Sequence, residues 1–199
     1  MLNCPLIFQQ LSDFVSTKTL VNHWHSNPTP CAALNDWLFA QGSLTQRLTA
    51  LCRTEFRVQL INEGWQTLSN SECATLDIAH NSLGWVREVF LCDGQQAWVF
   101  ARSVASQAAL QTASFDISQL GTRSLGELLF SDPAFSRGPM YINHLPSTEL
   151  PVQAQQQAKS AQRLWARRSC FQKDSLGVLV AEVFLPQFWQ DNGLSKLNT

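Results

Sequence analysis

The sequence predicts an α+β domain built on one antiparallel β-sheet. The Asp-Gly dipeptide at 93–94 separates two apolar runs, which is typical of a hairpin between antiparallel strands. A second pair of apolar runs, 164–172 and 178–186, is also joined by a short polar connection. Segments with helical periodicity stand apart from these runs instead of alternating with them, and this arrangement favours an α+β over an α/β architecture.

The composition is that of a globular protein. A chain of 199 residues suits one domain, so we expect residues 1–199 to form a single unit. Hydrophobic residues make up 45% of the chain, which is enough for a sizeable core, and charged residues only 15%. The net charge is −1 and no lysine-rich or arginine-rich run occurs, which argues against nucleic acid as a partner.

No stretch approaches the ~20 apolar residues of a membrane span, and the N-terminus lacks the pattern of a signal peptide. The six cysteines are scattered among apolar residues without a C-x-x-C spacing, which fits reduced thiols. We therefore expect a cytoplasmic protein, and a monomer.

The first part of the chain is expected to be mostly helical. Residues 1–30 should form a short helix followed by a loop rich in Asn, Pro and Thr. Residues 31–40 should form a helix, because apolar side chains recur on one face. A further helix should begin at Ser43, since Ser43 and Gln46 have the spacing of a capping box.

The middle of the chain is expected to form strands. Residues 55–61 alternate apolar and polar side chains, which predicts a half-buried strand. Residues 66–80 are polar and are expected to be irregular. The hairpin should cover residues 85–104, and strict alternation along its return strand would place Trp98 and Phe100 on one face.

The second half mixes helices with the last hairpin. Residues 105–121 should form a connection of small residues, in part helical. A helix should begin at Ser124, because Ser124 and Glu127 have the capping-box spacing. We expect residues 136–160 to form a variable loop or surface helix and residues 187–199 to form a loose tail.

Two charged residues interrupt apolar strands. Arg87 and Glu182 each share a strand face with apolar neighbours, and charges in such places are costly unless paired or exposed. If both faces point to the core, the two side chains enclose one space. A guanidinium is a fixed fork for a carboxylate, and a carboxylate in apolar surroundings takes or gives a proton near neutral pH. Together they outline a pocket for an acid that also bears a hydroxyl group.

The residues leave structural alternatives open. Arg87 and Glu182 could form a structural ion pair or reach solvent at sheet edges. Glu88 lies on the opposite face from Arg87 and is expected at the surface or against a helix. Of the adjacent Arg167 and Arg168, at most one can enter a given pocket, because successive strand side chains point to opposite faces.

Other candidate sites are backbone amides and a histidine pair. The Leu44 and Leu125 amides lie in the first turns of capped helices and could receive a ligand carboxylate, although water caps most helices. The H-W-H string at 23–25 lacks the cysteine or carboxylate that would complete a metal site, so we expect no metal. Nucleotide, dinucleotide and serine-hydrolase motifs are absent from the sequence.

In order and spacing, residues 34–186 resemble the chorismate pyruvate-lyase family. The matching strings are L-T-Q-R-L at 44–48, E-G at 63–64, W-V-R-E-V-F-L-C-D-G at 85–94, S-L-G-E-L-L-F at 124–130, L-W-A-R-R-S at 164–169 and A-E-V-F-L-P at 181–186. The resemblance implies a sheet of about six antiparallel strands flanked by helices, with an internal ligand pocket under helical flaps.

The resemblance also implies a reaction. A lyase of this family eliminates pyruvate from chorismate to give 4-hydroxybenzoate, the first step toward ubiquinone, with no cofactor and no metal. It places Arg87 at the ring carboxylate and Glu182 at the phenolic end of the ligand, both as catalytic residues. It places the backbone amides of Leu125 and Leu44 on the ligand as well. At Leu44 the family often has Met, which would change the shape of the pocket but not the amide.

Two other functions remain open. The same sheet architecture serves as the effector domain of certain transcription regulators, so the chain could be a sensor that binds a small acid without turnover. It could also be a structural or partner-binding domain with an internal ion pair.

Overall fold

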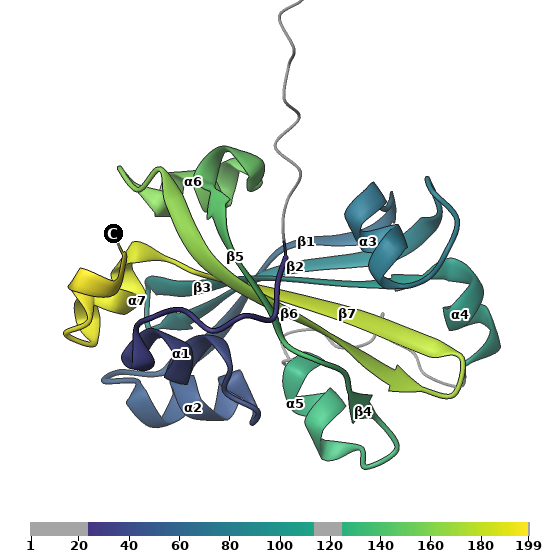
Figure 1. The fold of residues 1–199 in the computed structure, drawn as a ribbon, viewed down its shortest axis with the longest axis horizontal. Helices are drawn as coiled ribbons and strands as arrows, with labels where there is room; N and C mark the ends of the chain where they lie inside the picture. Colours follow the sequence, from purple (N-terminus) through teal and green to yellow (C-terminus); the bar gives the residue numbers. More distant parts are fainter. Residues whose placement is uncertain (1–23, 114–124, 199) are drawn as a thin grey trace, which may run out of the picture.

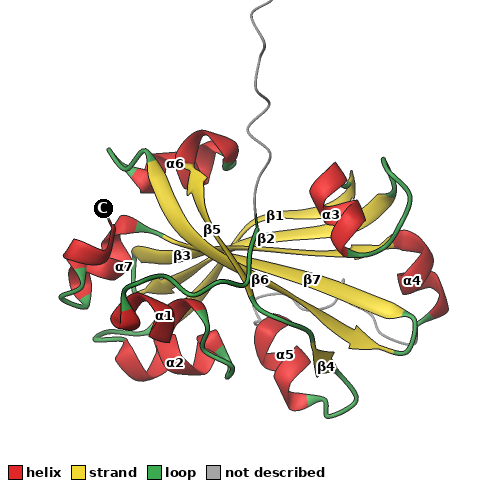
Figure 2. Cartoon of the chain, viewed as in Figure 1, coloured by secondary structure: helices red, strands yellow, loops and turns green. Residues whose placement is uncertain are grey.

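The computed structural model describes residues 24–113 and 125–198, which contain one antiparallel sheet of seven strands flanked by helices (Figures 1 and 2). The strand order is β1-β2-β3-β7-β6-β4, and β5 also pairs with β6. The predicted α+β class is confirmed. The strands are β1 Phe56–Thr67, β2 Leu83–Asp93, β3 Gln96–Ser106, β4 Ser136–Arg137, β5 Tyr141–Pro146, β6 Arg163–Lys173 and β7 Leu176–Phe184.

Helices lie on both sides of the twisted sheet, with α1, α2 and α5 on one side and α3 and α6 on the other (Figure 1). We call these sides the α2 face, which carries Arg87 and Glu182, and the α3 face, which carries Glu88 and Arg102. The helices are α1 Ala32–Leu38, α2 Leu44–Leu51, α3 Asn70–Thr75, α4 Gln107–Thr112, α5 Leu125–Ser131, α6 Val152–Ala158 and α7 Pro186–Asp191, with 3-10 turns η2 Ser147–Glu149 and η3 Ser195–Asn198.

The expected helices near the N-terminus are present where the structure describes them. The helix predicted over 31–40 is α1, and the one predicted from Ser43 is α2, whose Ser43 side chain accepts a hydrogen bond from the Gln46 amide. The short helix expected within residues 1–30 lies outside the described residues, and so does Ser124, the expected cap of α5.

Helix α3 was not expected, because residues 66–80 were predicted to be irregular. Its sequence contains the signal, since Ser69 and Glu72 form a complete capping box. The Ser69 hydroxyl accepts from the Glu72 amide, and the Glu72 carboxylate accepts from the Ser69 amide. Helix α3 positions Ser71 and Glu72 over the sheet.

The predicted Asp-Gly hairpin is confirmed as β2 and β3. Gly94 adopts φ +55°, a left-handed conformation that glycine tolerates, and Asp93 accepts hydrogen bonds from the backbone and hydroxyl of Thr54. The shared face predicted for Trp98 and Phe100 is wrong. The pairing of the two strands shifts just before Cys92, so Trp98 and Phe100 pack in different apolar clusters.

The C-terminal half is more regular than expected. Residues 136–160 contain the expected surface helix, α6, but the strands β4 and β5 take the place of the variable loop. The sheet therefore has one strand more than the six anticipated. The loose tail expected for 187–199 is wrong for residues 187–198, which contain α7 and η3. Phe188 and Trp189 are fully buried, and the Trp98 indole donates to the Asp191 carboxylate at 2.8 Å. These contacts fasten the C-terminus to β3.

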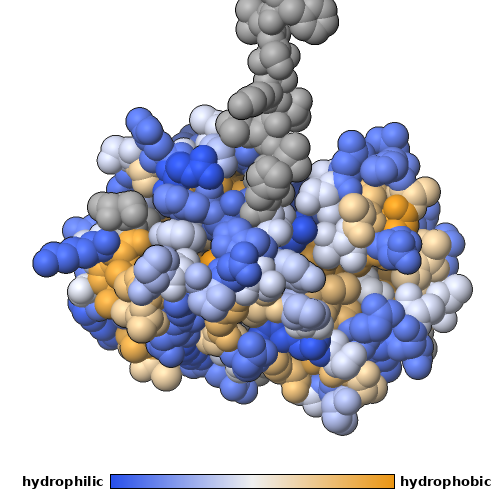
Figure 3. All heavy atoms as spheres, in the orientation of Figure 1, coloured by the Kyte–Doolittle hydropathy of each residue, from blue (hydrophilic) through white to orange (hydrophobic). Residues whose placement is uncertain are grey.

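The surface view in Figure 3 is dominated by hydrophilic residues, with apolar ones in small separate groups. Among the described residues, no helix is long and apolar enough to cross a membrane. The five described cysteines are free thiols, and Cys73 and Cys92 are buried.

Phe188 tests the importance of the C-terminal helix. Its ring packs on Trp37, Phe184 and Trp189 with centroid distances of 4.8, 5.2 and 4.9 Å. We expect Phe188→Ala to lower the free energy of unfolding by about 3–5 kcal/mol, because it leaves a cavity in the core. Urea denaturation measures this, with Val152→Ala, 65% exposed, as the control. Equal stability of the two variants would show that α7 is not part of the cooperative core.

Candidate active site

The register of the sheet puts Arg87 and Glu182 on the same face. Arg87 in β2 lies opposite Ser103 in β3, and Ser103 lies opposite Val180 in β7. Glu182 is two residues beyond Val180 and therefore points to the same side. Two strand spacings and two residues along the strand separate the Cα atoms of Arg87 and Glu182, which amounts to roughly 12 Å. Long side chains can converge on a small ring across this distance.

Each of the two charges is paired with the residue opposite it on a neighbouring strand. The Arg87 Nη1 donates to Glu63 Oε1 at 2.7 Å, and the Arg87 side chain is 3% exposed. The Arg167 Nε donates to Glu182 Oε2 at 2.6 Å, and the Arg167 side chain is 1% exposed. Glu182 therefore has a counter-ion, Arg167, on the neighbouring strand. Of the two adjacent arginines, Arg167 is the one on this face.

Arg167 also binds the loop that leads into α2. Its Nη1 donates to the carbonyl oxygens of Trp37 at 2.8 Å and Ala40 at 3.3 Å. From β4, the Arg137 Nη1 donates to the carbonyl oxygens of Gln41 at 3.0 Å and Ala40 at 3.4 Å. The two guanidiniums therefore hold the end of α1 and the turn before Ser43 against the sheet.

Arg137 belongs to the same charged group. Its Nε donates to the Ser169 hydroxyl at 2.7 Å. Burial lowers the pKa of Arg137 to about 10; the positive charge of Arg167 also lowers it, and the Glu182 carboxylate opposes the shift. Arg137 stays charged at neutral pH, so this end of the site carries two positive charges and one negative charge.

The two leucine amides proposed from the sequence belong to helices on this face. Leu44 and Leu125 are the first residues of α2 and α5, and both are buried. The two helices contact each other. The Ser43 hydroxyl accepts a hydrogen bond from the Gln46 amide, and this bond does not involve the Leu44 amide. First-turn amides of this kind favour an anion.

Apolar clusters flank the charged residues on both sides. One cluster contains Val89, Ala101 and Phe184 together with residues of α1, α2 and α7. The other contains Val178 and Val180 together with residues of α5. The charged side chains thus form a polar belt across the α2 face between two apolar regions. Such a site can orient a small polar acid while its walls exclude water.

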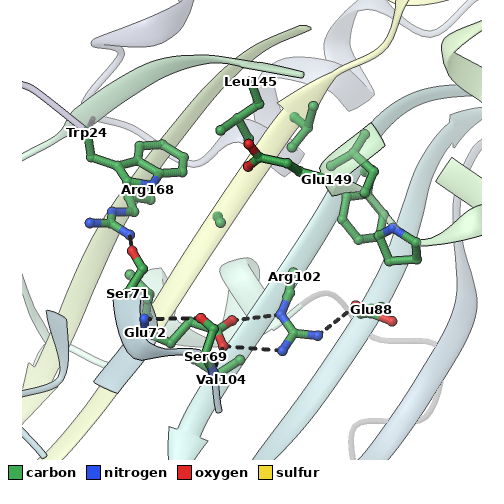
Figure 4. A pocket seen from close by; sticks show the side chains of 16 residues that line it. Trp24, Ser69, Ser71, Glu72, Glu88, Arg102, Val104, Leu145, Glu149 and Arg168 are labelled. Carbon is green, nitrogen blue, oxygen red and sulfur yellow. Dashed lines mark hydrogen bonds and ion pairs between the residues drawn. The ribbon is translucent and has the colours of Figure 1, made fainter. Parts of the chain in front are cut away.

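Glu88 lies on the α3 face, as its position after Arg87 requires. Of the two places expected for it, the surface is wrong and the side covered by a helix is correct. It is 4% exposed, and its carboxylate accepts from Arg102 Nη1 at 2.7 Å and from the Asn62 amide at 3.1 Å. Arg102 also donates from Nε to Glu72 at 2.7 Å (Figure 4). Burial opposes ionisation of both partners, but these bonds lower the pKa of Glu72 and raise that of Arg102.

Sequence reasoning did not identify Glu63, Arg137 or Ser169 as parts of this site. Glu63 is separated from the predicted strand by a register shift between Leu60 and Asn62, which reverses the side-chain alternation there. Arg137 lies in a strand of two residues, too short to show a periodic pattern. The charges could be found from the sequence, but their partners depend on strand pairing.

The histidine string is not part of this site. The backbone of His25 pairs with Ile142 at the sheet edge, and His23 lies outside the described residues. Among the residues the structure describes, no three His, Cys, Asp or Glu side chains are grouped as metal ligands would be.

The hydrogen bonds from Arg137 and Arg167 are expected to restrict the motion of the loop before α2. Arg137→Met removes hydrogen bonds to two carbonyl oxygens, each worth about 1 kcal/mol. We expect the amides of residues 41–46 to exchange hydrogen roughly tenfold faster, since local opening becomes easier. Hydrogen-exchange mass spectrometry measures this, with the exposed Arg57→Met as the control. Unchanged exchange in Arg137→Met would show that Arg137 does not hold the loop.

Comparisons with known proteins agree with the resemblance. Residues 20–194 match the family model described as chorismate lyase. A protein of Pseudomonas aeruginosa strain UCBPP-PA14 named "Probable chorismate pyruvate-lyase" is 54% identical over 162 residues, which cover 81% of this chain and 88% of that protein. "Probable chorismate pyruvate-lyase 2" of Pseudomonas fluorescens strain Pf0-1 is 52% identical, covering 82% of this chain and 86% of that protein.

Among solved structures, one from Streptomyces coelicolor, described as a proposed transcriptional regulator, superposes with a TM-score of 0.51 at 12% identity. The match covers 68% of this chain and 89% of that one. At this identity the match shows a common fold and nothing about function. The family match over residues 20–194 and the identities above 50% to curated relatives are much stronger evidence than this structural match. This chain belongs to the chorismate lyase family.

Proposed function

We propose that this chain is a chorismate pyruvate-lyase, which converts chorismate to 4-hydroxybenzoate and pyruvate. Membership of the chorismate lyase family supports this proposal. The observation that carries it is the polar belt on the α2 face, where the buried Arg87 and the largely buried Glu182 share one side of the sheet. A guanidinium and a carboxylate on the same side of the sheet suit a ligand with a carboxylate at one end and a hydroxyl at the other.

The ring carboxylate of chorismate would be bound by Arg87. A guanidinium has five N–H donors, and Glu63 fixes its orientation through Nη1. Two N–H groups of a guanidinium can form a bidentate bond with a carboxylate. We assign the Leu125 amide to the same carboxylate and the Leu44 amide to the ligand as well, because each stands in the first turn of a helix on this face.

Glu182 would act at the other end of the ring, near the 4-hydroxyl group. In the reaction the ether C–O bond breaks, the ring carbon that bears the hydroxyl loses its proton, and the departing enolpyruvate gains a proton to become pyruvate. Aromatisation drives these steps, so the protein needs mainly to orient the substrate and handle one proton. Arg167 holds one oxygen of Glu182, which directs the carboxylate at the ring.

We further propose a cytoplasmic monomer that supplies 4-hydroxybenzoate for ubiquinone synthesis. The five free cysteines among the described residues suit a reducing compartment. The mixed, largely hydrophilic surface in Figure 3 offers no large apolar patch for a partner on the face shown there. Gel filtration with light scattering measures the mass in solution.

The first test is Arg87→Ala. We expect kcat/KM for chorismate to fall at least a hundredfold, because one charge-assisted bidentate contact is lost and Glu63 is left without its cation. Pyruvate release and new aromatic absorbance report turnover, and the exposed Arg57→Ala should keep full activity. Near-wild-type turnover by Arg87→Ala would exclude the anchoring role. Chorismate binding without turnover by the wild-type protein would instead indicate a sensor.

Glu182→Gln tests proton handling. The substitution keeps size and hydrogen bonding but removes the charge, so we expect kcat to fall about a hundredfold while KM changes little. The control Glu55→Gln alters an exposed carboxylate and should leave kcat unchanged. If Glu182→Gln turns over at the wild-type rate, Glu182 transfers no proton and serves only to position the ring.

A further inference from the structure

A hollow lies on the α3 face, on the other side of the sheet from the polar belt. Its volume is about 500 Å³, which is within the range of small-molecule sites (Figure 4). Helix α3 borders it with Ser69, Ser71 and Glu72. The connection from β5 to α6 borders it with Leu145, Glu149, Leu150 and Pro151, and Trp24 completes the rim.

The sheet register explains why this hollow exists. A row of paired residues crosses the α3 face in the order Glu88, Arg102, Ala181, Arg168. Ala181 is the smallest side chain of the row and lies between two arginines, so the floor of the hollow is low at this point. Apolar rows run on both sides of it, with Phe100 and Val183 in one and Val104 and Leu179 in the other.

The two arginines of this row differ in their partners. Arg102 binds two carboxylates, those of Glu72 and Glu88, at 2.7 Å each. Arg168 donates from Nη1 to the neutral Ser71 hydroxyl at 2.9 Å, and its guanidinium lies 4.4 Å from the centre of the Trp24 ring. Its Nε is buried and has no hydrogen-bond partner in the described part of the chain.

Arg168 is therefore a half-buried cation whose direct contacts within residues 24–113 and 125–198 are with the neutral Ser71 and Trp24 side chains. Partial burial lowers the pKa of Arg168 to about 10, against the opposing influence of Glu72 and Tyr141, so it remains charged at neutral pH. Partial loss of hydration is unfavourable for a charge that no carboxylate bonds directly, and a carboxylate that binds Arg168 would offset part of that cost. Arg168 also lies at the junction with an adjoining hollow of about 500 Å³, which shares Ser71 and Leu179 with the first.

We propose that this hollow is a second binding site, for a small amphipathic monocarboxylate whose carboxylate pairs with Arg168 and whose apolar body lies over Ala181. Phe100, Leu145, Leu150 and Val183 form the apolar wall that would cover the body. The outer nitrogens of the Arg168 guanidinium supply donors for a carboxylate.

The charges around the hollow disfavour a ligand with more than one negative charge. Three carboxylates, those of Glu72, Glu88 and Glu149, line it together with the two guanidiniums. A phosphate or a dicarboxylate would bring extra negative charge close to these groups, whereas a single carboxylate is balanced by Arg168. The predominance of apolar lining residues in turn favours a ligand with a sizeable hydrocarbon part.

The two faces can be monitored separately. Ala181 points into this hollow, and Ala101 points to the α2 face because it is paired with Glu182. In protein labelled with ¹³C in alanine methyl groups, octanoate should shift the Ala181 resonance in a saturable manner and leave Ala101 unchanged. Octylammonium and 1-octanol have similar chains without the carboxylate, and we expect both to bind about tenfold or more weakly.

Substitutions then test the anchor and the floor. Arg168→Met should weaken octanoate binding about tenfold or more, while the exposed Arg57→Met should have no effect. Ala181→Leu should abolish binding by filling the floor. Circular dichroism and the thermal midpoint check folding, and if Ala181→Leu does not fold, Arg168→Met and the methyl shifts decide.

The proposal would be overturned by the absence of a saturable Ala181 shift, by octylammonium binding as tight as octanoate, or by an unchanged octanoate Kd in Arg168→Met. A shift of Ala101 in place of Ala181 would also overturn it, because the ligand would then bind on the α2 face. None of these measurements requires chorismate turnover, so the outcome is independent of the lyase proposal.

Discussion

The buried guanidinium of Arg167 joins the sheet to the end of α1 within the proposed active site. It bonds to Glu182 across the ladder between β6 and β7, and to the carbonyl oxygens of Trp37 and Ala40 at the end of α1. Side chain, sheet and loop are therefore positioned by one planar group with fixed geometry. Because Arg167 is 0% exposed, breaking any of these bonds leaves a polar group without water to replace its partner.

Local sequence signals predicted the elements whose cause is local. The Asp-Gly turn, the Ser43 cap and the strand over residues 55–61 each depend on a few neighbouring residues, and the structure contains all three. The alternation in that strand ends at Leu60, which is 44% exposed although the pattern places it on the buried face. The Ser69–Glu72 box had the same form and was overlooked. The C-terminal helix could not be predicted in this way, because Phe188 and Trp189 are helical and buried through tertiary contacts with α1 and β3.

In the candidate site, too, features with a local cause could be predicted and features that depend on strand pairing could not. Parity within each strand was enough to place Arg87 and Glu182 in apolar rows and to separate Arg167 from Arg168. Their partners Glu63 and Arg167 were not predictable, since pairing depends on a register that includes a shift in β1. The misplacement of Trp98 has the same origin, a shift in the β2–β3 pairing. Irregularities of this type are invisible to an alternating pattern.

The two faces of the sheet have the same plan. On each, arginine and glutamate from neighbouring strands lie between two apolar clusters. On the α3 face they share one row of paired residues, and on the α2 face Arg87 and Glu182 occupy adjacent rows. The apolar side chains therefore form four clusters, and the charged residues lie between them. A sheet of this design can keep an apolar interior next to several ionised side chains, because each helix needs to cover only one cluster.

The adjacency of Arg167 and Arg168, and of Ala181 and Glu182, has a mechanical consequence. These residues are successive along β6 and β7, and Arg167 and Glu182 form one rung of the ladder while Arg168 and Ala181 form the next. A peptide plane that tilts to improve a contact above the sheet moves the following side chain below it. Adjacent peptide planes thus give a direct route by which a change on one side of this sheet can reach the other, and any coupling of binding free energies along that route would be reciprocal.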